Sequence, residues 1–233
     1  PALAYYSRLS DHAVHAPEAL APTLAEGLRF ITFLTVPAGV ALALLAAPAV
    51  DVVYNWRSLM GTPMDAQLRA FTIAATMPLG FAVFPIGAFN LLVRTFYVRR
   101  LVRTPVLLVL IFLSVQGALY WALSHVWGIA GVAWATAIAA WLQLLVAAYL
   151  VARREGFGLA AWAREAAKVW LATGVAAGAA ALALHLVPLP AGWWGQVARL
   201  VVGGAVLMAA FAGVGAALGL PELNTLAGRL RRR

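Results

Sequence analysis

The residues best suited to bind a ligand are four arginines that lie close together in the chain, at Arg94, Arg99, Arg100 and Arg103. A guanidinium holds a phosphate through a planar pair of N–H donors. The cluster therefore predicts a contact with lipid phosphate or pyrophosphate, and we assign Arg94, Arg99 and Arg103 as candidate substrate-binding residues. The alternative is a loop that sets membrane topology and binds anionic lipid without specificity.

Residue patterns typical of catalysis are absent from the sequence. It contains no cysteine, no H-E-x-x-H or G-x-S-x-G motif and no phosphate-binding Walker loop. His12 and His15 lie beside Asp11 in the N-terminal tail. Such a group is more typical of a solvated turn than of a zinc site. We therefore expect no enzyme activity, no catalytic residues, no metal site and no cofactor.

A second group of polar side chains lies inside apolar stretches. Gln116, Tyr120 and Thr136 are spaced so that they can approach one another across two neighbouring helices. Two interpretations remain open: the three groups supply neutral oxygens to a cation, or they simply hydrogen-bond between helices. No Asp or Glu accompanies them, so no proton relay is predicted.

The elements that position these residues are membrane helices. The chain of 233 residues is 64% hydrophobic and 11% charged, with a mean hydropathy of +0.89. Soluble domains are about 45–50% apolar and about 25% charged. These values exclude a soluble enzyme, a disordered tail and a disulfide-rich secreted domain. They predict an all-α, polytopic membrane helix bundle, because only continuous helices satisfy their own backbone in lipid over such runs.

About six transmembrane helices are expected. One uncharged run, residues 104–152, is too long for a single span, and we divide it at the segment Ser124–Gly128. The expected spans are Phe30–Val50, Ala70–Val93, Pro105–Leu123, Ile129–Ala152, Val169–Val187 and Leu200–Leu220. Tryptophan and tyrosine lie near several span ends, as in an interfacial belt.

The distribution of charge predicts orientation. The net charge is +9, and all but three of the 17 Lys and Arg residues lie on one side of the expected spans. The exceptions are Arg57, Arg69 and Arg199. The positive-inside rule therefore places both termini in the cytoplasm. Because the basic residues cluster between apolar runs, we expect anionic lipids, and no nucleic acid, as partners. The chain begins with Pro1 and no cleavable signal, so we expect a fragment or a processed product.

These motifs also resemble a known family. The stretch from Arg94 to Pro105 reads R-x-F-Y-x-R-x-x-x-R-T-P and is similar to a loop of the lipid II flippase family, MurJ/MviN. Three further segments resemble that family in the same order along the chain: residues 1–10, 27–38 and 131–142. The resemblance implies the last helices of a fourteen-helix fold, with the tail of the eighth helix at the start.

The resemblance implies a domain organisation. Residues 1–29 would be the end of a preceding helix and a cytoplasmic loop, and residues 30–152 four transmembrane helices of the C-terminal lobe. Residues 153–168 would form a cytoplasmic interfacial loop, and residues 169–233 two extra C-terminal helices and a basic tail. The family's sodium site would fall near Gln116, Tyr120 and Thr136.

The resemblance further implies function and partners. The chain would be part of a flippase that moves lipid II, a polyprenyl pyrophosphate-linked glycan, to the outer leaflet of the bacterial inner membrane by alternating access. It would act in peptidoglycan biosynthesis together with a missing N-terminal lobe. The alternatives are a flippase for another polyprenyl-linked glycan and a non-transporting scaffold for cell-wall synthesis.

Overall fold

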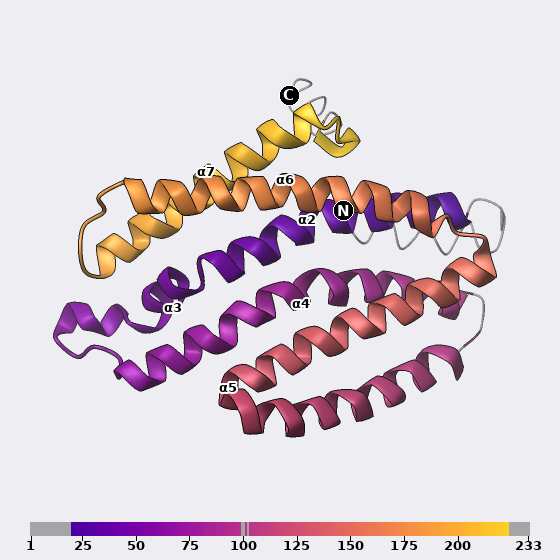
Figure 1. Cartoon of the computed structure of the whole chain (residues 1–233), viewed down its shortest axis with the longest axis horizontal. Helices are drawn as coiled ribbons and strands as arrows, with labels where there is room; N and C mark the ends of the chain where they lie inside the picture. Colours follow the sequence, from indigo (N-terminus) through magenta and orange to yellow (C-terminus); the bar gives the residue numbers. More distant parts are fainter. Residues whose placement is uncertain (1–19, 99–100, 102, 224–233) are drawn as a thin grey trace.

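The structure is a computed structural model that describes residues 20–98, 101 and 103–223. Within these ranges the chain forms helices and connecting turns, with no strand. The long helices run roughly side by side, so that most chain reversals lie at one of two ends of the bundle (Figure 1). In chain order the helices are α2 (Leu20–Leu44), α3 (Ala46–Tyr54), the short 3-10 helix η2 (Trp56–Met60), α4 (Ala66–Val98), α5 (Arg103–Glu155), α6 (Leu159–Leu186) and α7 (Trp193–Ala217).

Five of these helices, α2, α4, α5, α6 and α7, are long and apolar enough to cross a membrane. The predicted all-α, polytopic membrane bundle is therefore confirmed. α5 contains 53 residues. At about 1.5 Å per residue a straight helix of this length would measure about 80 Å, whereas the hydrocarbon core is about 30 Å thick. α5 must therefore turn back on itself.

α5 reverses direction at Gly128, inside the segment where the sequence predicts a break. Gly128 has a φ of 56° and a ψ of −133°, a conformation that residues with a Cβ rarely adopt. Gly131 lies close against the carbonyl of Leu123 across this turn, where an added Cβ would overlap the oxygen. α5 is therefore a hairpin of two arms, residues 103–127 and 129–155, as Figure 1 shows.

Two helix boundaries have local causes. Pro48 is the third residue of α3 and has no N–H to donate to the carbonyl of Leu44, so the chain breaks at Leu45, between α2 and α3. At the start of α4, the Asp65 Oδ1 accepts hydrogen bonds from the backbone N–H groups of Gln67 and Leu68, at 2.9 and 3.0 Å. This cap satisfies two donors that the first helical turn leaves unpaired.

The core forms where α2 packs against α4 and α6, and α4 packs against α5. Leu28, Leu92 and Ala172 are fully buried there. Aromatic rings from α5 and α6 surround Phe84 of α4: its ring centroid lies 5.4 Å from that of Trp141, 6.4 Å from that of Trp162 and 6.0 Å from that of Trp170. Trp162 and Trp170 lie before and near the start of an expected span, where an interfacial belt would hold them, and they pack against the core instead.

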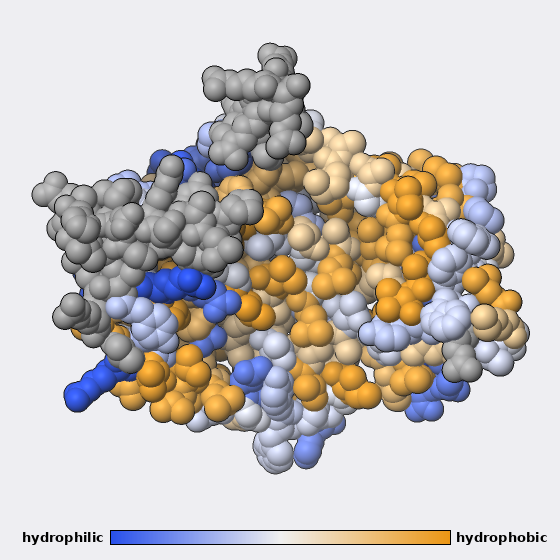
Figure 2. Space-filling model, turned by 180° about the vertical axis from the view of Figure 1, so that it is seen from behind, coloured by the Kyte–Doolittle hydropathy of each residue, from blue (hydrophilic) through white to orange (hydrophobic). Residues whose placement is uncertain are grey.

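Apolar side chains also cover much of the outer surface. Figure 2 shows them across the middle of one face, with the most hydrophilic residues mainly toward its edges. α4 buries 50% of its most apolar stretch, whereas α5 buries only 6%. Such a surface is suited to lipid or to further protein, and not to water.

Candidate functional site

The described residues of the predicted arginine cluster lie where α4 ends and α5 begins, at the right of Figure 1. Arg94 is on the last turns of α4 and Arg103 is the first residue of α5, so the two helix ends bring them to the same end of the molecule. Both side chains are exposed. Arg99 and its neighbour Arg100 fall outside the described residues, so the assignment of Arg99 stays a prediction.

The structure adds two residues that the sequence analysis used only for orientation. Arg153 and Arg154 close the second arm of α5. The Arg154 guanidinium carbon lies 6.0 Å from the ring centroid of Phe96 on α4, and that of Arg153 lies 4.9 Å from the ring of Tyr149. We call Arg94, Arg103, Arg153 and Arg154 the arginine-rich surface. The signal in the sequence was Phe96 itself, an aromatic residue inside the arginine motif on which a guanidinium can stack.

This surface has the chemistry to hold phosphate. Arg153 and Arg154 are exposed, and stacking on aromatic rings fixes the plane of a guanidinium at a gain of about 0.5–1 kcal/mol. A fixed guanidinium loses less freedom when it forms two parallel hydrogen bonds to a phosphate. The arrangement therefore fits a polyanionic headgroup better than it fits a neutral one.

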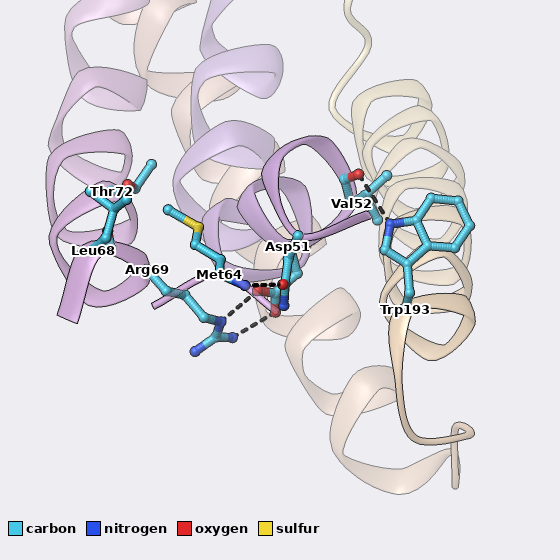
Figure 3. Close-up of polar contacts among 8 residues, drawn as sticks. Asp51, Val52, Met64, Leu68, Arg69, Thr72 and Trp193 are labelled. Atoms are coloured by element: carbon cyan, nitrogen blue, oxygen red, sulfur yellow. Dashed lines mark hydrogen bonds and ion pairs between the residues drawn. The ribbon is translucent and has the colours of Figure 1, made fainter. Parts of the chain in front are cut away.

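A second charged group lies at the opposite end of the bundle. Asp51 of α3 is 3% exposed, and its carboxylate accepts two hydrogen bonds from Arg69 of α4 (Figure 3). The Arg69 Nε donates to Oδ1 at 2.5 Å and Nη2 donates to Oδ2 at 2.6 Å. This bidentate ion pair joins α3 to α4, which a loop separates along the chain.

α3 is also tied to the final hairpin. The indole Nε1 of Trp193, at the start of α7, donates to the carbonyl of Val52 at 3.1 Å (Figure 3). The side chain of Asn55 accepts a hydrogen bond from the backbone N–H of Met64 at 2.8 Å. α3 therefore connects α4 to α7 at the end away from the arginine-rich surface.

This pair was not predicted from the sequence. The expected spans end at Val50 and begin again at Ala70, so Asp51 and Arg69 were seen only as residues that flank them. The available signal was their position: Asp51 directly follows the first expected span and Arg69 directly precedes the second, so a hairpin of the two spans brings them to the same end.

The three polar residues of α5 do meet. The Gln116 Nε2 donates to the Tyr120 hydroxyl at 2.5 Å, and that hydroxyl lies 2.9 Å from the Thr136 Oγ1 on the other arm. Their predicted approach is confirmed. The structure shows hydrogen bonds between the arms, and no group of three His, Asp or Glu residues that could hold a metal gathers within the described residues.

Comparison with known proteins identifies the family. The family model described as "Lipid II flippase MurJ" matches residues 2–200, which is most of the chain. The chain belongs to the MurJ family. This confirms the resemblance carried by the Arg94–Pro105 motif. No curated protein matches the chain by sequence.

A solved structure agrees with the MurJ fold. The structure titled "Lipid II flippase MurJ, inward closed conformation" superposes with a TM-score of 0.68 at 16% sequence identity. The match covers 93% of this chain and 44% of the other. The chain thus spans less than half the length of that MurJ protein, and it is a multi-pass membrane protein of the same fold.

Proposed function

We propose that this chain is the C-terminal part of a lipid II flippase in the bacterial inner membrane. It moves the polyprenyl pyrophosphate-linked peptidoglycan precursor to the outer leaflet by alternating access, together with an N-terminal lobe that supplies the rest of the central cavity. The observation that carries the proposal is the family match over residues 2–200, together with the MurJ fold.

The arginine-rich surface supports a role in headgroup binding. Arg94 and Arg103, with Arg99 between them in sequence, present guanidiniums at the end that the charge distribution assigns to the cytoplasm. The pyrophosphate of a lipid-linked precursor carries several acceptor oxygens and negative charge, which arginine forks match. In this proposal the surface makes the first contact with the headgroup or gates its entry, and it also attracts anionic lipids.

The α6–α7 hairpin supports a role in holding the hydrocarbon tail. Its outer surface exposes large apolar side chains, and the described part of α6 carries no charge after Lys168. Leu171 is 59% exposed and Met208 is 58% exposed. A long isoprenoid chain can lie along such a surface and cover both side chains, so that other lipids no longer contact them.

Transport by the full-length protein tests the headgroup role. The triple variant Arg94→Gln, Arg99→Gln, Arg103→Gln should lower the rate of lipid II flipping in proteoliposomes by at least about tenfold, because each charge-assisted hydrogen bond contributes about 1.5–3 kcal/mol. The control is Arg199→Gln, which removes an exposed arginine near the start of α7, at the opposite end. An unchanged rate in the triple variant would overturn the headgroup role.

Depletion of the protein in its native cells tests the substrate. Accumulation of lipid II with loss of cell shape supports the proposal. Loss of a capsule or surface glycan, with normal lipid II turnover, would instead indicate a flippase for another polyprenyl-linked glycan. Cell-wall defects with normal flipping in vesicles would indicate a scaffold.

A further inference from the structure

A pocket separate from the arginine-rich surface lies between the start of α2 and the turn that joins α5 to α6. Figure 1 shows these segments near each other at the same end of the bundle. The pocket encloses about 290 Å³. It is lined mainly by apolar groups, with one arginine and one glutamate: Ala21, Pro22, Ala25, Arg29, Phe157, Gly158, Ala161, Trp162 and Glu165.

The size and walls of the pocket suit part of a lipid. Binding sites for whole small molecules enclose about 300–1,000 Å³, so this pocket is at the lower limit. Its walls come from Pro22 and Ala25 on one side and from Phe157 and Trp162 on the other. An acyl-chain segment fills such a space favourably, whereas water finds few polar partners there.

Trp162 presents an unused hydrogen-bond donor in this region. Its Nε1 is buried and has no acceptor in the part of the chain that the structure describes. The ring is held by Phe84 and Phe157, whose centroids each lie 6.4 Å from that of Trp162. An unpaired buried donor costs about 1–3 kcal/mol, and a ligand oxygen would remove that cost.

The charges on the rim discriminate between headgroups. Lys168 donates to Glu165 at 2.9 Å. Arg29 and Glu165 also line a smaller cavity beside the pocket, together with Glu222. The pocket lining thus carries one cation, Arg29, and one carboxylate, Glu165. Lys168 and Glu222 lie beside it and add one charge of each sign. A purely anionic headgroup would meet the Glu165 carboxylate as well as Arg29, whereas a headgroup with a phosphate and an ammonium group matches charges of both signs.

We propose that this pocket binds a phospholipid whose headgroup carries a phosphate and a primary ammonium, as phosphatidylethanolamine does. An acyl segment lies between α2 and α6. Lipid oxygens accept hydrogen bonds from the Trp162 indole and the Arg29 guanidinium, and the ammonium donates to Glu165. The lipid fastens the start of α6 to α2, and this role does not depend on which glycan lipid is transported.

Native mass spectrometry of the full-length protein tests the proposal. The protein is equilibrated with mixed vesicles of phosphatidylethanolamine and phosphatidylglycerol, and the retained lipid is identified by mass. The unaltered protein should retain phosphatidylethanolamine preferentially. Trp162→Phe keeps the ring and removes only the donor, so retention should fall about fivefold, the equivalent of about 1 kcal/mol. Trp193→Phe is the matched control, since it removes an indole donor at the opposite end.

A second variant tests the headgroup preference. Glu165→Gln removes the partner of the ammonium, so it should shift the preference toward phosphatidylglycerol. This result supports the proposal even if Trp162→Phe fails to fold. Equal retention of the two lipids by the unaltered protein would overturn the proposal, as would a preference that Glu165→Gln leaves unchanged.

Discussion

At the scale of single residues, the Asp51–Arg69 pair has an uneven environment. The Asp51 side chain is 5% exposed, while that of Arg69 is 38% exposed. Removing a carboxylate from water is costly, and the attraction of one guanidinium with two aligned hydrogen bonds offsets that cost. Arg69 keeps part of its hydration, so the pair loses less than a fully buried pair would. The pair therefore fixes how α3 meets α4.

Asp51→Asn should lower the stability of the full-length protein by about 2 kcal/mol, because Arg69 loses its charged partner; breaking fully buried pairs costs about 3–5 kcal/mol. The measurement is the thermal unfolding midpoint in detergent. Asp65→Asn is the control, because it removes the same charge from the neighbouring loop and asparagine still caps α4. Equal midpoints for the two variants would contradict a stabilising role for the pair.

Residue contacts could be predicted where local geometry fixes them. Gln116 and Tyr120 lie four residues apart on one helix, so they share a face wherever the helix lies. Their contact with Thr136 followed from placing the turn near Gly128. The contact of Arg154 with Phe96 depends on how the second arm of α5 packs on α4, and the sequence alone does not contain that packing.

At the scale of helices, α2 and α4 cross with their backbones in contact. Gly39 and Gly80 face each other at the crossing, and a Cβ on either one would overlap the carbonyl oxygen of the other. A Cβ added to Gly80 would also lie 2.9 Å from the backbone nitrogen of Ala43. Small residues at such crossings allow extensive van der Waals contact where no hydrophobic effect drives association.

Gly80→Ala should therefore destabilise the bundle. The added methyl meets backbone, which cannot rotate away, so we expect a loss of about 1–3 kcal/mol or more. Gly117→Ala is the matched control: it lies in the first arm of α5, where an added Cβ meets nothing within 4 Å. It should be neutral or stabilise by up to about 1 kcal/mol. The yield of monodisperse protein on size-exclusion chromatography, with the unfolding midpoint, checks both; equal behaviour would count against the crossing.

Helix positions could be predicted better than helix ends. The reversal at Gly128 falls in the predicted segment because an uncharged run of that length must turn. The start of α6 at Leu159 was harder to place, because the segment before Val169 contains charges and was expected to belong to a cytoplasmic interfacial loop. It is continuous with α6, and Trp162 within it packs on Phe84.

At the scale of the whole molecule, charge separates the two ends. The end of α4 and the α5–α6 turn share one end of the bundle, and α3 and the reversal of α5 lie toward the other (Figure 1). The first end carries the arginine-rich surface and the pocket, and α3 carries Asp51 of the Asp51–Arg69 pair. The sequence predicted this division from the spacing of arginines between apolar runs. How this chain would meet an N-terminal lobe could not be predicted, because no motif in the sequence specifies that contact.

The proposed orientation can be measured with single cysteines, since the chain has none of its own. Met60→Cys, at a position 72% exposed near the start of α4, should react with a membrane-impermeant maleimide added to intact cells. Ala163→Cys, at an exposed position near the start of α6, should react only after permeabilisation. These results follow from the positive-inside rule. The opposite labelling pattern would invert the orientation, in a background without other cysteines.

The α5 hairpin has a consequence for biogenesis. From Thr104 to Ala152 the ribosome delivers an apolar stretch without a single Asp, Glu, Lys or Arg, so neither arm carries its own orientation signal. The signals stand outside it, at Arg103 and at Arg153 and Arg154. Both arms must therefore leave the insertion machinery together as one closed loop, with translocation of only the short Gly128 segment. An arginine introduced beside Gly128 would oppose that translocation and strand both arms on the cytoplasmic side.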